Sequence, residues 1–184
     1  MENILLEVEK VTDYTGMQKK EALRLRLLAE ELVGMLRELV KNFEGRFWIQ
    51  NNANLYELHA ELSVETLSKE TKESLIAVSA NKKNAAASSF MGKIRDIAEN
   101  MLLFSEEPYV SGVAGLDYMY DYNVVDANFT YVWTLEYYTK QQENSEKSSE
   151  VWDQLEKSIV AKLADDVIVG VRGKKVEIII KKEF

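Results

Sequence analysis

The sequence predicts an α+β fold, a two-layer sandwich in which helices cover one face of a mixed, mostly antiparallel sheet. Three observations predict this class. A long amphipathic helix is expected over residues 17–43, a pair of strand-like segments follows it at once, and a second such pair occupies residues 167–184. Short strands paired through tight turns favour antiparallel neighbours, and the helix needs a flat apolar surface to cover.

The long helix is predicted from its apolar spacing. Within residues 17–43, large apolar side chains recur at steps of three and four, which places them along one stripe. Gly45 follows and is the expected helix stop. The stripe comprises Leu25, Leu28, Leu32, Leu36, Leu39 and Phe43.

Strands are predicted at both ends of the chain. Residues 3–9, within NILLEVEK, are expected to form a first strand, with DYTG as its turn. Residues 46–50 and 55–63 form a hairpin around NNAN, because asparagine favours turns. A second hairpin is expected around RGKK, from VIVGV to VEIIIKKEF. In its second strand, Val176, Ile178 and Ile180 face one way, and Glu177, Ile179 and Lys181 face the other.

The remaining segments complete a single domain over residues 1–184, with an insertion at about 79–128. Residues 129–138 alternate like a strand, yet Trp133 and Tyr137 are also one helical turn apart, so strand and helix both stay open. The tyrosine-rich stretch 105–128 is expected to be an irregular loop. Three further helices are expected, over residues 66–78, 88–104 and 149–164. In the second, one face comprises Phe90, Ile94, Ile97, Met101 and Phe104. The third is capped by Ser148 or Ser149, and its inward residues are Trp152, Leu155, Ile159 and Leu163.

Composition excludes several classes of function. The net charge of −8 opposes binding to a phosphate backbone, so nucleic acid is not an expected partner. The chain has no cysteine and a single histidine, His59, which excludes disulfides and multi-histidine metal sites. No signal-peptide pattern and no apolar run of about 20 residues is present, so we expect a cytoplasmic protein without a membrane partner.

The order of the elements resembles a known family. A strand, a long helix, a hairpin, helices, a loop, a helix and a hairpin look like the ATPase domain of histidine kinases and gyrase (the GHKL group), and most closely the anti-sigma-factor serine kinases. In AEELVGML, Glu31 then takes the place of the family's catalytic glutamate, and Met35 takes that of the asparagine that holds Mg²⁺. In LYELHAELSVE, Glu61 lies at or near the adenine-binding aspartate.

The resemblance also covers the insertion and the end of the chain. It implies a lid over about 79–128, in which Lys93 would approach phosphates and Gly112 and Gly115, in SGVAGLDY, look slightly like the family's last glycine box. Residues 149–182 resemble the closing helix and hairpin. The likeness is one of topology, because no signature motif is intact.

Two departures concern the nucleotide site. Methionine cannot complete the oxygen shell of Mg²⁺, so the metal site is expected to be lost at Met35. No glycine follows Glu61 closely, which removes the close backbone approach to adenine. Glu38 and Asn42 offer the same Glu-x-x-x-Asn spacing in another register, but an asparagine at the end of a helix more often caps it.

For each candidate residue, an interpretation in which it binds no ligand is also open. Glu31 is a possible general base or a solvated side chain, and Glu61 is a possible adenine ligand or a surface carboxylate. His59 is expected to be an ordinary packed or exposed histidine. The loop 109–122 is a partner surface or a cover over the core. Four basic residues are expected either to bind an anion or to form a solvated face: Lys82, Lys83, Lys93 and Arg95.

The sequence therefore supports three hypotheses. The first is a regulatory protein of bacterial signalling, with a degenerate nucleotide site, that acts by protein interaction and is not a standard Mg-ATP-dependent kinase. The second is an ATP-binding serine kinase of the anti-sigma type, with ATP as its cofactor. The third, in which Glu31 and Glu61 act as paired carboxylates of another enzyme, is not required by their spacing.

Overall fold

A computed structural model describes residues 2–39, 44–63, 94, 97–98, 101–102, 129–143 and 158–184. The helices that have full bounds are α1 (Glu2–Thr15), α2 (Lys19–Leu39), α5 (Leu135–Glu143) and α7 (Ile159–Leu163). The strands are β1 (Glu44–Asn52), β2 (Leu55–Ser63), β3 (Tyr131–Thr134), β4 (Asp166–Arg172) and β5 (Lys175–Glu183). Both predicted hairpins are confirmed, with turns at residues 53–54 and 173–174.

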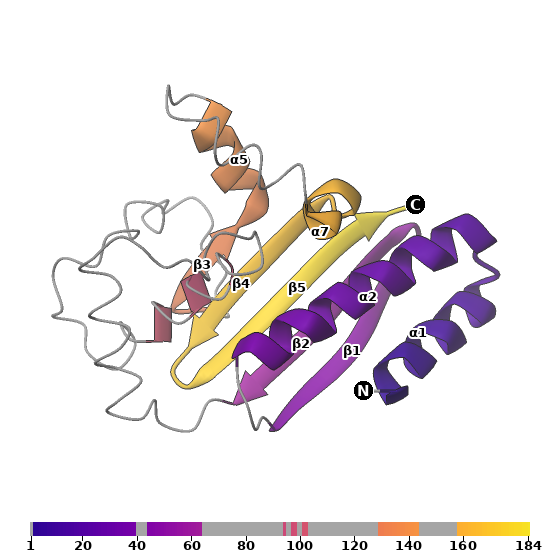
Figure 1. Ribbon diagram of the computed structural model, residues 1–184, viewed down its shortest axis with the longest axis horizontal. Coiled ribbons are helices and arrows are strands. Elements are labelled where there is room, and N and C mark those ends of the chain that lie inside the picture. Colours follow the sequence, from indigo (N-terminus) through magenta and orange to yellow (C-terminus); the bar gives the residue numbers. More distant parts are fainter. Residues whose placement is uncertain are drawn as a thin grey trace, which may run out of the picture.

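The five strands form one sheet in the order β1-β2-β5-β4-β3 (Figure 1). Every pairing among these strands is antiparallel, so the parallel pair that a mixed sheet would contain is not among them. The two hairpins join through β2 and β5, which places Leu58 opposite Ile180 and Ala60 opposite Ile178. The centre of the sheet is therefore built from segments far apart in the sequence.

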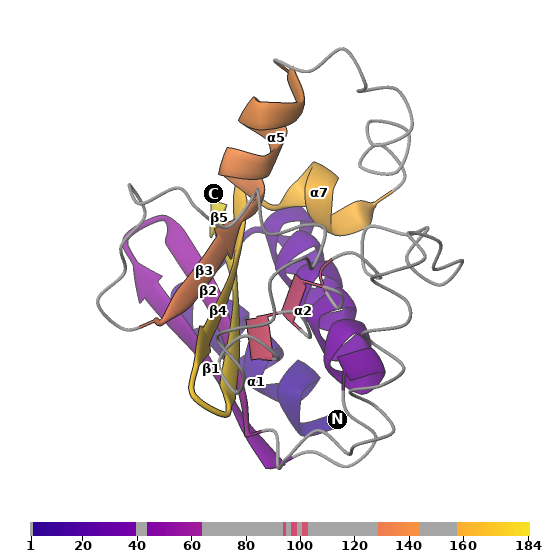
Figure 2. The same ribbon diagram turned by 90° about the vertical axis from the view of Figure 1, so that its left-hand side faces the viewer.

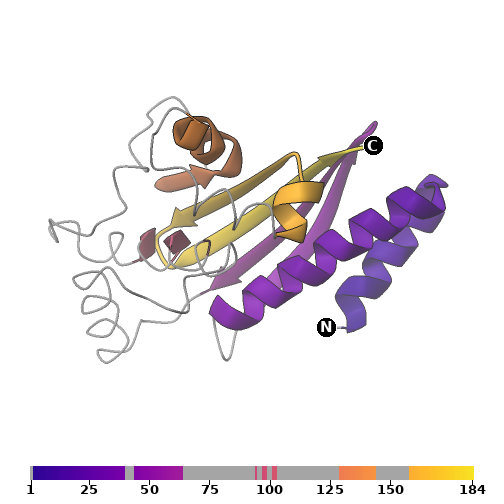
Figure 3. The ribbon, with the colours of Figure 1, turned by 45° about the horizontal axis from the view of Figure 1, so that its top comes forward.

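Helices α2, α1 and α7 lie on one face of the sheet (Figure 2), and α1 lies outside α2 on the β1 side (Figures 1 and 3). The stripe predicted for α2 is buried at Leu25, Leu28, Leu32 and Leu36. It packs with alternate residues of the central strands, and burying each large side chain contributes about 1.5–3 kcal/mol. These strand residues are Leu58, Ala60, Leu62, Val167, Val169, Val171, Val176, Ile178 and Ile180.

The strand predicted over residues 3–9 is wrong, because this segment belongs to α1. Val8 and Thr12 are buried one helical turn apart, and the leucines, glutamates and lysine of ILLEVEK are good helix formers. Gly16 ends α1 with φ at +65°, while the amides of Gly16 and Met17 donate to the carbonyls of Asp13 and Thr12. DYTG is thus a helix C-cap, which glycine favours because it tolerates positive φ.

The residue that was expected to stop α2 belongs to a strand instead. The helix was predicted to run to residue 43 and to stop at Gly45; residues 40–43 lie outside the described residues, and Gly45 lies inside β1, opposite Leu62. Gly45 is therefore a strand residue and does not cap the helix. Glycine in a strand lacks a side chain to pack, which is compatible with this position near the beginning of β1.

The ambiguous segment 129–138 contains both structures. Its first part is β3, and its second part begins α5 at Leu135. Thr134 ends β3 and caps α5, because its hydroxyl accepts a hydrogen bond from the amide of Tyr137 at 3.2 Å, as an N-cap does. Asp166 on β4 accepts another from the amide of Glu136 at 2.9 Å. Two orphan amides at the start of α5 are thus satisfied.

Of the helix predicted over 149–164, the structure describes residues from 158 onward, where Ser158 has extended backbone angles and caps α7. Ile159, predicted to point inward, is 43% exposed, and Val160 is the buried residue instead. Leu163 packs partly against the core, as expected, while the predicted cap at Ser148 or Ser149 lies outside the described residues.

Replacing Ser158 by alanine should lower the free energy of unfolding by about 1 kcal/mol. Its hydroxyl accepts a hydrogen bond from the amide of Ala161 at 3.2 Å, which the variant would leave without a partner. Urea unfolding measures the loss, with Ser158→Asp as the control that retains an acceptor. Equal stability of Ser158→Ala and the unmodified protein would contradict this role.

Other predictions lie mostly outside the described residues. The helix 66–78 and the loop 105–128 fall there entirely. Within 88–104, residues 94, 97–98 and 101–102 are helical, and Ile94, Ala98 and Met101 are fully buried. This part of the predicted helix is confirmed and adds to the core.

Candidate functional site

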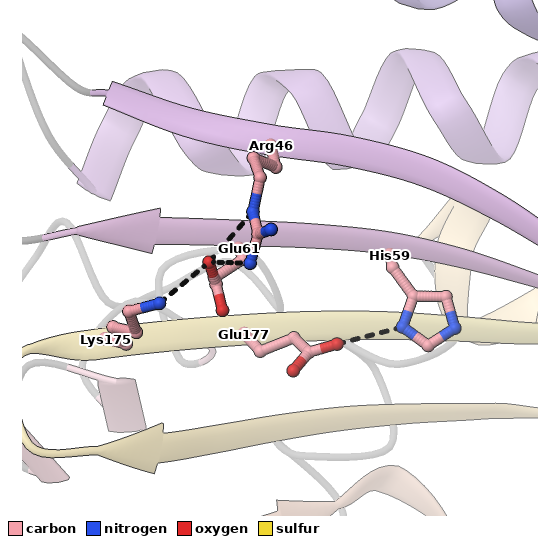
Figure 4. Close-up of polar contacts among 5 residues, drawn as sticks. All are labelled: Arg46, His59, Glu61, Lys175 and Glu177. Atoms are coloured by element: carbon pink, nitrogen blue, oxygen red, sulfur yellow. Dashed lines mark hydrogen bonds and ion pairs between the residues drawn. The ribbon is translucent and has the colours of Figure 1, made fainter.

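The candidate site lies on the outer face of the sheet, which we define as the face away from α2. Because side chains alternate along a strand, burial of Leu58, Ala60 and Leu62 toward α2 turns Glu57, His59 and Glu61 to the outer face. The register then aligns partners from both neighbouring strands. Figure 4 shows Arg46, Lys175 and Glu177 gathered with His59 and Glu61 on this face.

His59 is the centre of the first cluster. The strand register places it between Trp48 on β1 and Ile179 on β5. Its ring stacks on Trp48 with centroids 4.8 Å apart and planes 10° apart, and the residue is only 7% exposed. The side chain is therefore held within the outer face and not presented to solvent.

Two carboxylates flank the His59 ring. Nδ1 lies 2.9 Å from Oε1 of Glu177, and because a carboxylate accepts, Nδ1 carries the hydrogen. Nε2 lies 3.6 Å from Oε2 of Glu57, beyond hydrogen-bond distance, and is buried without a hydrogen-bond partner. Burial acts to raise the pKa of Glu57, but Lys181 at 2.9 Å, with His59, outweighs burial and lowers that pKa.

Glu61 is the centre of the second cluster. Arg46 donates to its Oε1 from Nη2 at 2.7 Å and from Nε at 3.2 Å, and Lys175 donates to the same oxygen at 3.2 Å. The hydrogen bond from Arg46 is the main cause of a lowered pKa for Glu61; burial opposes it and Lys175 adds to it. The carboxylate is thus committed to two cations from β1 and β5.

The lowered pKa of Glu61 predicts a pH-dependent contribution to stability. Since its pKa is lower in the folded than in the unfolded chain, the ionised carboxylate stabilises the fold above the ordinary glutamate pKa of about 4.3. This contribution is lost as the pH falls through the folded-state pKa. Glu61→Gln should therefore be less stable at about pH 7, by less than about 1 kcal/mol, and should approach the unmodified protein at about pH 3.

Urea unfolding of both proteins at the two pH values measures this difference. Arg46→Gln removes the main partner and serves as the second arm of a double-mutant cycle with Glu61→Gln. The double variant is expected to lose less than the sum of the two single losses. A stability difference that is the same at both pH values, or strict additivity, would contradict the assignment.

The structure separates the two acidic residues singled out by the resemblance. Glu31 is a half-buried residue of α2, on the helix side of the sheet. Glu61 points to the outer face, where Arg46 and Lys175 hold it (Figure 4). The sheet lies between them, so the structure does not bring Glu31 and Glu61 together in one site.

Several candidates fall outside what the structure describes. These are Lys82, Lys83, Lys93, Arg95, Gly112 and Gly115, together with the loop 109–122. Met35 belongs to α2, although its side chain is not described. Within the described ranges, no group of three or more histidine, aspartate or glutamate side chains is arranged to hold a metal ion. None of the helices in those ranges is long and apolar enough to cross a membrane.

Sequence reasoning missed the partners of His59. Glu177 was recognised as pointing away from Val176 and Ile178, but its neighbour is set by the pairing of β2 with β5, which brings together residues 118 positions apart. Alternation along a strand predicts which face of the sheet a side chain occupies, but only the register between strands determines its cross-strand partner. The sequence signal for these contacts was the set of charged residues on the outer face of the two strands, 55–63 and 175–183.

The geometry of the His59 cluster favours a structural role. A general acid or base must reach the proton it transfers, whereas the Nε2 atom of His59 is buried and its ring is covered by Trp48. The cluster instead connects three strands, through Trp48 on β1, His59 on β2 and Glu177 on β5. It is a cross-strand cluster that stabilises the sheet.

Comparisons with protein-family models, with curated proteins and with solved structures gave no significant match.

Proposed function

We propose that this protein is a regulatory protein that acts by binding another protein, on a degenerate form of the GHKL-type ATPase fold. The observation that carries the proposal is the separation of Glu31 and Glu61 by the sheet. A nucleotide site in which one carboxylate acts at the phosphates and the other at the adenine requires both to face one pocket. Here the second carboxylate is engaged by two cations on the far face.

The residue at the place of the metal ligand supports the same proposal. Mg²⁺ demands oxygen ligands in nearly octahedral geometry, and a thioether at position 35 supplies none. Phosphoryl transfer relies on the metal to neutralise charge on the phosphates. A standard Mg-ATP-dependent kinase activity is thus disfavoured by chemistry, independently of the geometry.

The surface of β1 supports binding to a protein. Arg46 has a side chain that is 72% exposed, and its guanidinium carbon lies 5.9 Å from the ring centroid of the half-buried Trp48. Arginine and tryptophan are enriched among the residues that dominate interface energies. Their adjacency on an edge strand offers a contact point for a partner.

The alternative is an ATP-binding serine kinase of the anti-sigma type. The observation that favours it is Glu31, which is half-buried on the long helix that the resemblance equates with the nucleotide-binding helix. A half-buried carboxylate at the border of the apolar stripe is available to a ligand beside the helix.

Titration calorimetry and thermal unfolding with ATP and ADP, each with and without Mg²⁺, separate the two proposals. A ligand present at 100 times its Kd would raise the free energy of unfolding by about 2.7 kcal/mol, so binding is readily detected. We expect no stabilisation at millimolar nucleotide. Saturable binding that Glu31→Gln abolishes, and that the neighbouring control Glu30→Gln retains, would overturn our proposal and establish the alternative.

A further inference from the structure

The two edges of the sheet differ in a way that points to a binding mode. β3 at one edge has four residues, whereas β1 at the other edge has nine. An edge strand presents unpaired backbone N–H and C=O groups, which another extended chain can bind. Proteins usually limit such edges by keeping them short, as at β3. The β1 edge is therefore longer than is usual for an edge strand.

The sequence and register of β1 lack three common protections of an edge strand, namely proline, lysine and a bulge. Its sequence, EGRFWIQNN, contains neither proline nor lysine, and its register with β2 runs from Glu44 to Asn52 without a bulge. In the part of the chain that the structure describes, β1 has a hydrogen-bonded neighbour strand only on its β2 side. Among the described residues, the outer side of β1 is thus a continuous template for strand pairing.

We propose that β1 receives an extended segment of a partner protein as an additional, antiparallel strand. This inference rests on the proposed function, protein interaction, and names its site and mode. Strand addition draws affinity from main-chain hydrogen bonds and specificity from alternating side chains. The additional strand would lie on the β1 side of the sheet, where α1 lies outside α2 (Figures 1 and 3).

The side chains of β1 specify the chemistry of the segment. On the outer face, Arg46 donates to Glu61 from Nε and Nη2 but stays exposed, so it fits a second carboxylate, and Trp48 fits an aromatic ring directly opposite. On the helix face, the partly buried Phe47 and Ile49 pack against the core and favour aliphatic neighbours. The partner segment therefore has aliphatic side chains on the helix face, and these alternate with an acidic and an aromatic side chain on the outer face.

The strand that already pairs with β1 has this pattern. In β2, LYELHAELS, Glu61 lies opposite Arg46, His59 opposite Trp48, and aliphatic residues face α2. A peptide with the β2 sequence is therefore a suitable probe for the free edge. The chemistry that serves one side of β1 serves the other, because both neighbours see the same alternating side chains.

A second copy of this chain fits the edge less well. Antiparallel pairing of two β1 strands over their whole length would centre on Trp48 and place Arg46 opposite Gln50, without a carboxylate. Both copies also carry a net charge of −8, which opposes association. A partner segment of the stated chemistry is thus favoured over self-association.

The test uses the whole chain and a fluorescently labelled LYELHAELS peptide, with binding measured by anisotropy. The two-residue turn at 53–54 closes on the pair Asn52–Leu55, so the amides of alternate residues, including the exposed Asn51, point to the free edge. Asn51→Pro removes one such donor at an edge position that tolerates proline. Asn51→Ala is the matched control, since it retains the amide.

We expect saturable peptide binding, weakened about threefold to tenfold by Asn51→Pro and nearly unchanged by Asn51→Ala, as for the loss of one hydrogen bond. Thermal unfolding establishes that both variants are folded. Absence of binding at millimolar peptide, or equal binding by the two variants, would overturn the inference. A dimer in sedimentation equilibrium that Asn51→Pro dissociates would also overturn it, since a second copy would then occupy the edge.

The two proposals fail separately. Nucleotide binding that depends on Glu31, together with peptide binding that depends on the Asn51 amide, would overturn the proposed function and leave strand addition intact. Absence of nucleotide binding combined with absence of peptide binding would overturn strand addition alone.

Discussion

Replacing Leu28 by alanine is expected to lower the free energy of unfolding by about 2–5 kcal/mol. Leu28 is fully buried in α2, where it packs in the core between the helix and the sheet. The smaller side chain would lose the transfer free energy of three carbon atoms and leave a cavity that the rigid sheet cannot fill by collapsing. For a domain stable by about 5–15 kcal/mol, this is a large fraction of the total.

Leu23→Ala in the same helix is the matched control. Leu23 is 57% exposed, so its removal from water on folding is small, and alanine and leucine have similar helix propensities. We expect its effect to remain within about 0.5 kcal/mol. Urea unfolding followed by circular dichroism measures both variants. Equal losses for Leu23→Ala and Leu28→Ala would contradict the packing of α2 on the sheet.

Gly170→Ala is expected to lower the free energy of unfolding by about 1–3 kcal/mol, through overpacking. Gly170 lies on β4, and the ring of Phe129 covers it so closely that an added Cβ would lie 2.4 Å from the ring atom Cδ1. The ring would also be 2.5 Å away at Cγ, near its attachment to the backbone, so rotation of the ring does not relieve the contact. Glycine is required here by the close approach of an aromatic ring.

A double-mutant cycle with Phe129→Ala tests this explanation. Removal of the ring removes the three nearest contacts of a methyl group at position 170, and alanine is conformationally more favourable in a strand than glycine. Gly170→Ala should therefore be neutral or stabilising in the Phe129→Ala background. A loss of equal size in both backgrounds would show that the cost of the methyl group does not come from Phe129.

The elements that could be predicted from the sequence are those decided by local pattern. The hairpins around residues 53–54 and 173–174 follow from alternation and turn chemistry, and α2 follows from its leucine stripe. The strand predicted over 3–9 failed because ILLEVEK is too apolar to show a clear period. The cap at Gly16 was the better signal, since it ends a helix.

The candidate site could be predicted only in part, because its contacts are non-local. Glu61 and His59 were identified as residues of interest, but their partners come from β1 and β5 through strand registers. Likewise, the expectation that Glu31 and Glu61 share one site came from the resemblance alone, and the sequence gives no information about which face of the sheet each one occupies. Tertiary pairing decides that question.

The pairing of β2 with β5 has a consequence for synthesis of the chain. More than one hundred residues separate Ser63 from Lys175, so a ribosome needs roughly 6 to 20 seconds to make the intervening chain. A β1–β2 hairpin formed during that interval would lack β5, the strand that completes the layer of Leu58, Ala60 and Leu62. Both edges of such a hairpin would present unpaired backbone groups to other chains, so we expect the newly made protein to be most prone to aggregation before β5 emerges.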